Sequence, residues 1–158
     1  TMTKQLKELE YNPKFYFAYR APDPMAWGTA LGKDGDYVVL GPGWCYGVKI
    51  PGVKELNESH MKKFNRPADV ITGPAYACVQ ALANAIERAG ALDREKIRDA
   101  IAATNMVTVI GPLKFRPDGT GVVVYLGVQW QKGRQEIVFP KEYATAPLVY
   151  PMPKWSER

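Results

Sequence analysis

The sequence predicts an α/β protein whose last part is an antiparallel meander. Two observations lead to this class. In several segments up to Ala103, apolar residues recur every three or four positions, as they do along one face of a helix. From Val107 onward they tend to alternate with polar residues, as in strands with one buried face. The expected order is helix, strand, loop, strand, three helices and then the meander.

The composition is that of a folded domain. The 158 residues are enough to bury a core, and 46% apolar with 23% charged residues is near the globular average. The longest apolar run, Val122–Val128, is too short to span a membrane. The net charge is 21 − 16 = +5, with the basic residues spread along the chain. This spread favours a solvated surface over a nucleic-acid or membrane interface, so no nucleic-acid partner is expected.

The first residues predict half of an α/β unit. Met2, Leu6 and Leu9 form one helical stripe, and a proline at position 13 ends the helix. The aromatic-rich segment Lys14–Arg20 is typical of a strand. Because no strand precedes the helix, we expect the chain to start in the middle of a fold. No signal peptide is seen, so the protein is either cytosolic or has lost its beginning.

A loop, a short strand and three helices are predicted for the middle of the chain. Residues 21–36 are rich in proline and glycine and form the loop, with a helical turn around Met25–Leu31, and Tyr37–Leu40 is the strand. Gly90 and Asp93 have the residue types of a helix C-cap and N-cap. The expected helices are Val53–Asn65, with Val53, Leu56, Met61 and Phe64 inward; Gly73–Gly90, with Ala75, Cys78, Val79, Leu82, Ile86 and Ala89 inward; and Arg94–Ala103.

The last third has turn residues at the spacing of a meander. Proline and glycine in the segment 116–119, and a glycine at position 133, favour tight turns between strands. The tail after residue 139 carries four prolines and is expected to be extended. The expected strands are Val107–Phe115, interrupted at Gly111-Pro112, then Gly121–Trp130 and Gln135–Phe139.

No catalytic, metal or cofactor motif is apparent. His60 is the only histidine and lies in an expected surface helix, which disfavours a nucleophilic triad and a zinc site. The glycine-rich segments 28–33 and 41–47 lack the spacing of phosphate-binding loops. We therefore expect a binding protein without catalytic residues, metal or cofactor, and not an enzyme.

Cys45 and Cys78 are the only cysteines and form no C-x-x-C motif. One disulfide is compatible with this count, but two buried free thiols are favoured. The cysteine count therefore does not decide whether the protein works in an oxidising or a reducing compartment.

One group of residues suggests a binding pocket. Tyr19 and Arg20 fall at the carboxyl end of a predicted strand, where open α/β sheets bind ligands. The guanidinium of Arg20 is suited to a carboxylate. Trp27, Trp44 and Tyr46 lie in nearby loops and are candidates for apolar walls. The alternative is that these aromatic side chains are core residues and that Arg20 faces solvent.

A series of segments in fixed order resembles the C-terminal portion of substrate-binding proteins of the leucine/isoleucine/valine-binding type, which serve ABC importers. Members of that family have the type I periplasmic-binding fold. No single motif is diagnostic, and the resemblance covers essentially the whole chain. The segments are Gly73–Tyr76, the alanine-rich helix ending at Ala85–Gly90, Asp93–Ile101, Gly111–Phe115 with Asp118-Gly119, Gln129–Gly133 and Val138–Pro140.

The resemblance implies two α/β lobes that clamp a ligand between them and are joined by three crossings. Residues 1–45 would belong to the second lobe and residues 46–125 to the returning part of the first lobe. Residues 126–158 would cross back to the second lobe and form the extended tail. Family members are more than twice as long, so the resemblance implies a fragment. Exposed sheet edges would then favour pairing, including a homodimer of the fragment.

The implied function is that of a non-enzymatic solute-binding component, periplasmic or lipid-anchored outside the cytoplasm, that delivers a small molecule to a membrane permease. Amino-acid binders of the family place an acidic residue after the strand matching Lys14–Arg20. Here no glutamate follows, Arg20 is present and Asp23 is close. An aromatic or aliphatic carboxylate is therefore as compatible as a branched-chain amino acid, with Tyr19, Arg20, Asp23, Trp27, Trp44 and Tyr46 as candidate ligand-binding residues. A ligand-sensing regulatory domain on the same fold is the alternative function.

Overall fold

A computed structural model describes residues 2–158, and the chain divides into two compact units. Unit 1 contains both ends of the chain, the residues up to Val48 and Tyr125–Arg158. Unit 2 is the intervening segment, Lys49–Val124. The mixed α/β architecture predicted from the sequence is confirmed. The assignment of the two units to lobes of a larger binding protein stays a prediction.

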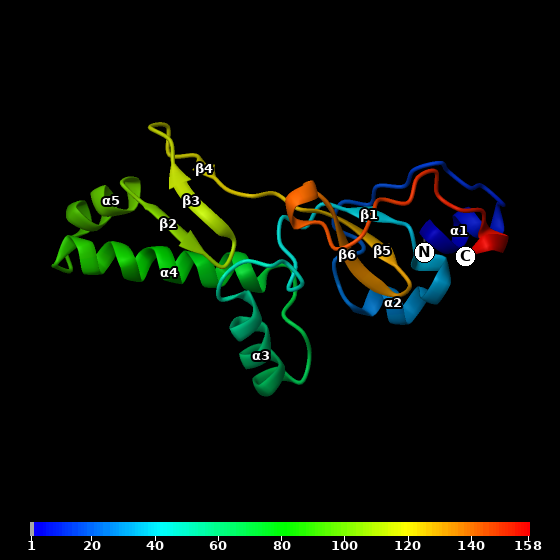
Figure 1. The fold of residues 1–158 in the computed structure, drawn as a ribbon, viewed down its shortest axis with the longest axis horizontal. Helices are drawn as coiled ribbons and strands as arrows, with labels where there is room; N and C mark the ends of the chain where they lie inside the picture. Colours follow the sequence, from blue (N-terminus) through cyan, green and yellow to red (C-terminus); the bar gives the residue numbers. More distant parts are fainter. Residues whose placement is uncertain (1) are drawn as a thin grey trace. The chain divides into compact units, whose positions relative to one another are not determined.

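Unit 1 is built on a three-stranded antiparallel sheet (Figure 1). Its strand order is β1 (Val39–Leu40), β5 (Gly127–Gln131) and β6 (Arg134–Phe139). The turn between β5 and β6 has positive φ angles at Lys132 and Gly133, 52° and 72°, as a tight hairpin turn requires. The predicted turn and the last predicted strand are therefore confirmed.

The predicted strand Lys14–Arg20 is wrong in its extent. Only Phe17 forms a bridge, parallel to Val39, with the Ala18 amide donating to the Val39 carbonyl at 2.9 Å. The Val39 amide donates in turn to the Tyr16 carbonyl. Because β1 is only two residues long, it offers no backbone partners for a longer ladder. The segment is extended on either side of this bridge and then turns at Tyr19.

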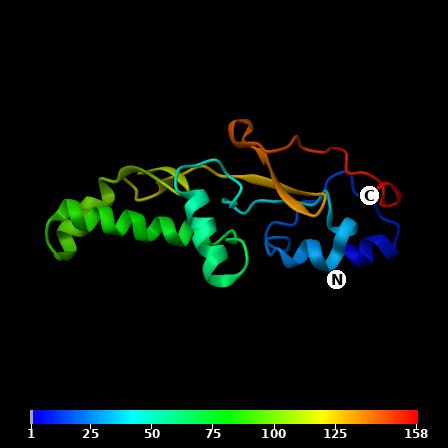
Figure 2. The same cartoon turned by 60° about the horizontal axis from the view of Figure 1, so that its bottom comes forward.

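Two short helices accompany this sheet, α1 (Met2–Glu8) and α2 (Ala26–Leu31). The α2 helix lies against the β5–β6 hairpin (Figure 2), and a Cβ on Gly28 would come within 2.6 Å of the Trp130 ring. Close packing at this point therefore requires glycine. The predicted apolar stripe of α1 is wrong, since Thr3 is its buried residue while Met2 and the following Leu9 are exposed.

The core of unit 1 joins the sheet to the C-terminal tail. Gln129 is buried, and its amide group bonds the carbonyls of Tyr37 and Val149 and the Val149 amide. The tail is extended as predicted, apart from two 3-10 turns at Lys141–Tyr143 and Trp155–Glu157. The largest apolar residues of this core are Val38, Leu40, Trp44, Leu126, Val128, Trp130, Ile137 and Met152.

Unit 2 combines three helices with a second antiparallel sheet. Gly90 ends α4 in a left-handed conformation, and Asp93 caps α5 by accepting a hydrogen bond from the Lys96 amide at 2.9 Å. Both predicted caps are thus confirmed. The elements are α3 (Val53–Phe64), α4 (Thr72–Ala89), α5 (Arg94–Ala102), β2 (Asn105–Thr108), β3 (Gly111–Phe115) and β4 (Gly121–Val122), with strand order β2-β3-β4.

Two predicted strands are each divided in the structure. The segment Val107–Phe115 is a hairpin, with β2 and β3 joined by a turn that places Gly111 at a φ of 91°. The segment Gly121–Trp130 contains β4 and β5, which belong to different sheets. The reason is that the chain passes from unit 2 to unit 1 between residues 124 and 125. Alternation of apolar residues cannot reveal such a change of sheet.

The buried face of α4 is the opposite of the predicted one. Its buried residues are Gly73, Ala77, Ala81 and Ala85, at a spacing of four. The helix packs against α5 and β2 through these small residues, which allow a close approach of the backbones. The larger side chains of the predicted inward stripe, such as Val79 with 64% of its area exposed, point to solvent. Leu82, Cys78 and, on α3, Met61 and Phe64 are exposed in the same way.

Both cysteines are free, as expected. Cys45 is buried, whereas Cys78 is exposed, so the prediction of two buried thiols is wrong for Cys78. Burial raises the pKa of the Cys45 thiol. Within residues 2–158, none of the helices has the length and apolarity needed to cross a bilayer.

The packing of α4 leads to a stability test. Ala85 is fully buried, so Ala85→Leu should overpack the interface and lower the free energy of unfolding by about 1–3 kcal/mol. Ala83 lies on the exposed side of the same helix, so Ala83→Leu should change the free energy of unfolding by less than about 0.5 kcal/mol. Urea denaturation followed by circular dichroism measures both. Equal effects of the two substitutions would show that α4 buries a different face.

Candidate functional site

Unit 1 contains a cavity of about 400 Å³ between α1, the segment 16–21 and α2. Tyr19, Arg20 and Trp27, three of the predicted site residues, all line it. The indole nitrogen of Trp27 donates a hydrogen bond to the Gly35 carbonyl at 2.9 Å, which fixes the ring in the cavity wall. The structure thus brings these three residues together as predicted, although the strand expected to carry them is only a single bridge.

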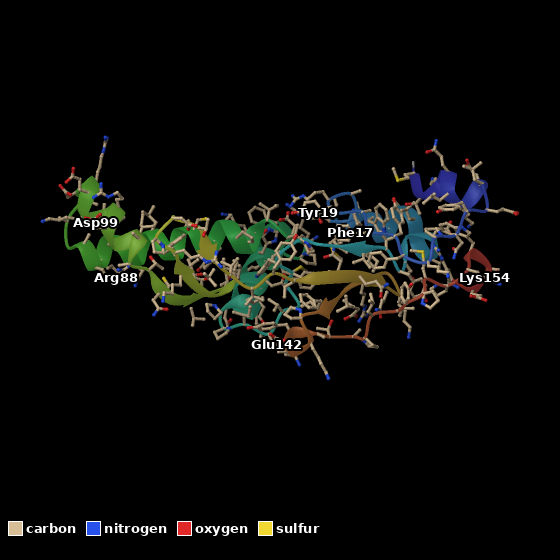
Figure 3. All side chains as sticks on the ribbon, turned by 90° about the horizontal axis from the view of Figure 1, so that it is seen from above. Phe17, Tyr19, Arg88, Asp99, Glu142 and Lys154 are labelled. Carbon is tan, nitrogen blue, oxygen red and sulfur yellow. The ribbon has the colours of Figure 1, made fainter. Side chains whose placement is uncertain are left out.

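Three half-exposed aromatic residues gather next to this cavity, and we call them the aromatic cluster: Phe17, Tyr19 and Tyr125. The ring centroids of Phe17 and Tyr19 are 6.0 Å apart, and their side chains lie close together in Figure 3. The Tyr125 hydroxyl donates to the Gly41 carbonyl. A Cβ on Gly41 would lie 2.8 Å from that hydroxyl and 3.3 Å from the Tyr19 ring. Gly41 therefore lets the aromatic cluster close over the backbone.

A buried carboxylate lies near the aromatic cluster. Asp23 is 8% exposed, and its Oδ2 is 3.0 Å from Nε of Arg20 in an ion pair. Among the described residues, no group donates a well-aligned hydrogen bond to either carboxylate oxygen. Burial raises the pKa of Asp23, and the positive charge of Arg20 opposes this only in part. Asp23 therefore has unused acceptor capacity in a desolvated position.

The ionisation of Tyr125 shows that these groups are electrostatically connected. Burial, the Tyr19 phenol and the negative charge of Asp23 raise the pKa of Tyr125 to about 12, while Arg20 acts in the opposite direction. The aromatic cluster, Arg20 and Asp23 thus share one local field.

The loop that carries Asp23 is held by the β5–β6 hairpin. The Trp130 indole nitrogen donates to the Pro22 carbonyl at 2.8 Å. The Gln135 side-chain amide donates to the Asp23 carbonyl, also at 2.8 Å. The Asp23 amide closes a turn on the Arg20 carbonyl at 3.2 Å. The strands therefore fix the position of the acid through the backbone and leave its carboxylate available.

Two predicted site residues lie elsewhere. Trp44 is 1% exposed and belongs to the core of unit 1, as the alternative interpretation of the aromatic residues expects. Tyr46 is half-buried, and burial raises the pKa of its phenol, with the charges of Arg134 and Glu136 acting in opposite directions. Neither Trp44 nor Tyr46 lines the cavity, and Asp23 is not among its lining residues either, but lies next to it through its ion pair with Arg20.

Sequence reasoning missed Phe17, Gly41 and Tyr125. A signal for Phe17 existed, because it alternates with Tyr19 and extended chains place such residues on the same side. Tyr125 lies far away in the sequence, so only the folded chain brings it to this place. The same holds for Gln135 and Trp130, which hold the loop.

The chemistry available here is recognition. Exposed aromatic faces offer apolar contact, Asp23 offers hydrogen-bond acceptors to a cation, and Arg20 offers donors to an anion. His60 lies in unit 2, with its Nδ1 2.9 Å from the Arg66 carbonyl oxygen. In the part of the chain that the structure describes, no three side chains of His, Cys, Asp or Glu gather in a way that could hold a metal ion.

Comparison with known proteins gives one family match and several related structures. The family described as periplasmic binding protein matches residues 1–135. A leucine-, isoleucine-, valine-, threonine- and alanine-binding protein of Pseudomonas aeruginosa is 35% identical over 69 residues, which is 44% of this chain and 18% of that protein.

Solved structures agree in fold. A leucine-binding protein from Thermotoga maritima superposes with a TM-score of 0.73 at 20% identity, covering 86% of this chain and 39% of the other. A solute-binding protein of an ABC transporter from R. palustris, in complex with benzoate, superposes with a TM-score of 0.68 at 16% identity, covering 94% of this chain and 47% of the other. The chain thus spans less than half the length of these relatives.

The raised pKa of Asp23 leads to a pH test. Below the ordinary value of 3.8 the carboxyl is protonated in both the folded and the unfolded chain, so burial carries no charge penalty. As pH rises through the higher pKa of the folded state, the buried charge appears and stability is lost. We therefore expect Asp23→Asn to be more stable than wild type at neutral pH, with the difference shrinking on acidification.

Urea unfolding across this pH range measures the effect, with Asp118→Asn as the contrasting control. Hydrogen bonds from the Thr120 side chain and amide lower the pKa of Asp118, so wild type should lose stability relative to this control variant as the pH falls. An Asp23→Asn difference that grows on acidification would contradict the placement of a desolvated carboxylate here.

The contact at Gly41 gives a second test. Gly41→Ala should force the Tyr125 hydroxyl away from the Gly41 carbonyl and cost about 1–3 kcal/mol. Tyr125→Phe removes the clashing atom, so the double variant should cost less than the sum of the two single changes. Gly47→Ala is the control, because its Cβ would meet nothing closer than 4.0 Å. Strict additivity in thermal or urea unfolding would rule out the contact.

Proposed function

The chain belongs to the periplasmic binding protein family, and from this premise we propose that it recognises a small zwitterionic solute, a branched-chain or related amino acid, for an ABC importer. Members of this family bind solutes and carry out no chemical reaction on them. The observation that carries the proposal is Asp23, a buried carboxylate beside the aromatic cluster that pairs with Arg20 and, among the described residues, receives no well-aligned hydrogen bond. Such an acid is suited to receive the ammonium group of an amino acid.

Each part of the solute has a matching group in unit 1. The ammonium would donate to the free oxygens of Asp23, which lowers the cost of burying that carboxylate. The solute carboxylate would exchange places with Asp23 as the partner of the Arg20 guanidinium, which is 54% exposed at its side chain and can reorient. Tyr19 and the rest of the aromatic cluster would cover the apolar side chain.

The relatives support different solutes. The curated relative from Pseudomonas aeruginosa is named for leucine, isoleucine, valine, threonine and alanine, and the Thermotoga maritima structure for leucine. These amino acids carry both charges. The R. palustris structure holds benzoate, which has a carboxylate and an aromatic ring but no cation. Arg20 and the aromatic cluster favour benzoate as a second candidate. The negative charge of Asp23 favours the amino acid, because it repels a ligand that is only an anion.

A role in transport would use both lobes of the family architecture. Unit 1 would be part of one lobe and unit 2 part of the other, and a ligand that contacts both lobes would shift them toward a closed state. A permease in the membrane would then receive the solute on the side that faces away from the cytoplasm. A ligand-sensing regulatory domain would use the same site with another partner, so a ligand-dependent interaction with permease subunits is the feature that separates these roles.

Ligand binding gives the direct test. Saturation-transfer NMR and calorimetry on the 158-residue chain, with leucine, isoleucine and benzoate as probes, should detect binding of the two amino acids. Asp23→Asn should weaken leucine binding at least about tenfold, because a charge-assisted hydrogen bond is lost. The same substitution should leave benzoate binding unchanged or stronger. Arg20→Gln should weaken both kinds of ligand.

The control is Glu142→Gln, which changes one exposed acid of unit 1 that does not line the cavity. It should bind all three probes as wild type does. Unchanged leucine affinity in Asp23→Asn would contradict the proposed role of the acid. Benzoate binding without amino-acid binding would favour the second candidate.

A further inference from the structure

Unit 2 has a groove of its own, of about 590 Å³, between α5 and the end of β3. Three cationic residues line it, Arg98, Lys114 and Arg116. Its apolar lining residues include Ile101, Phe115 and Pro117, and no acidic residue lines it. We call this the basic groove. It lies in a different unit from Asp23 and the aromatic cluster, and nothing said of the solute site depends on it.

The acidic residues next to the basic groove already have partners. Asp99 accepts hydrogen bonds from Arg98 at 2.7 and 2.9 Å; Figure 3 labels this acid on α5. Asp118 accepts hydrogen bonds from the Thr120 amide and hydroxyl at 2.9 and 2.7 Å, which lowers its pKa. Asp99 is therefore paired with Arg98, and within residues 2–158 neither acid forms an ion pair with Lys114 or Arg116.

Two cations of the groove form no ion pair among the described residues. Lys114 is exposed and, within residues 2–158, makes no ion pair or side-chain hydrogen bond. Arg116 donates one hydrogen bond to the Thr120 hydroxyl at 3.1 Å and makes no ion pair in the same described part of the chain. Arg98 keeps a side chain that is 69% exposed. The lining of the groove therefore combines net positive charge with apolar side chains; we call Arg98, Lys114 and Arg116 the cationic rim and Ile101, Phe115 and Pro117 the apolar floor.

We propose that the basic groove binds an acidic segment of a partner protein, with carboxylates on the cationic rim and an apolar side chain on the floor near Phe115. Charge complementarity requires a partner segment with negative charge. The apolar lining favours a peptide that also carries an apolar side chain over a simple anion. Binding proceeds through side chains, because β3 is paired on both edges, with β2 and with β4, and cannot accept an added strand.

Nucleic acid fits the basic groove less well. Single-stranded nucleic acid needs a series of aromatic faces on which successive bases stack, together with cations that follow the phosphates. The lining of the groove contains one aromatic residue, Phe115, and that residue is half-buried. An oligonucleotide is therefore the competitor in the test and not the expected ligand.

The test uses fluorescence anisotropy with the full 158-residue chain and a labelled peptide of sequence Asp-Glu-Leu-Asp-Phe-Glu. Wild type should bind this peptide, and binding should weaken severalfold when salt is raised from about 50 to about 500 mM. Lys114→Glu combined with Arg116→Glu should weaken it at least about tenfold. Lys62→Glu, a single charge reversal at an exposed site on α3, should have at most the small effect of the change in net charge, and Lys62→Glu combined with Lys63→Glu matches the double variant in net charge.

Several outcomes would overturn the proposal. These are no binding by wild type, equal weakening by Lys62→Glu, equal binding of a peptide with lysine in place of its acids, or tighter binding of a short single-stranded oligonucleotide. Replacing the leucine and phenylalanine of the peptide by serine should weaken binding severalfold, and an unchanged affinity would exclude the apolar floor. If the double variant is unfolded by circular dichroism, the single change Lys114→Ala at an exposed position gives the same comparison.

Discussion

The candidate site depends on the hydrogen bonds from the β5–β6 hairpin to the loop at residues 22–23. Trp130 and Gln135 hold the carbonyls of Pro22 and Asp23, each at 2.8 Å. These backbone contacts keep a carboxylate in a desolvated place although, among the described residues, none donates a well-aligned hydrogen bond to it. Without them, the acid would turn to solvent, because an unsatisfied buried charge is costly. The sheet thus provides the rigidity, and the loop provides the chemistry.

The site has an incomplete polar network next to exposed aromatic faces. Arg20 reaches Asp23 in one ion pair, and the aromatic cluster leaves ring faces half-exposed next to it. A protein selected only for stability would complete or remove such groups. Unsatisfied acceptors and exposed aromatic faces are what a ligand can use, so the loss in stability and the capacity to bind have one origin.

Unit 2 follows a different principle, in which small residues bring elements close together. The alanine face of α4 packs on α5 and β2 and leaves larger apolar side chains such as Val79 and Leu82 outside. The cationic side chains of the basic groove are Arg98 on α5, Lys114 on β3 and Arg116 directly after β3. The two units therefore offer surfaces of different chemistry, an aromatic and zwitterion-compatible one in unit 1 and a cationic one in unit 2.

Local interactions determined what could be predicted from the sequence: the α4 and α5 helices with their caps at Gly90 and Asp93, the hairpin turn at residues 132–133, and the presence of Tyr19, Arg20 and Trp27 at one site. Each depends on neighbours a few positions away, so periodicity and turn residues reveal it. Only the tertiary structure decided which face of α4 is buried, where the strands change sheet, and that Trp44 is core. It also brought Tyr125 and the hairpin to Asp23, because those contacts join residues about a hundred positions apart, for which no local pattern exists.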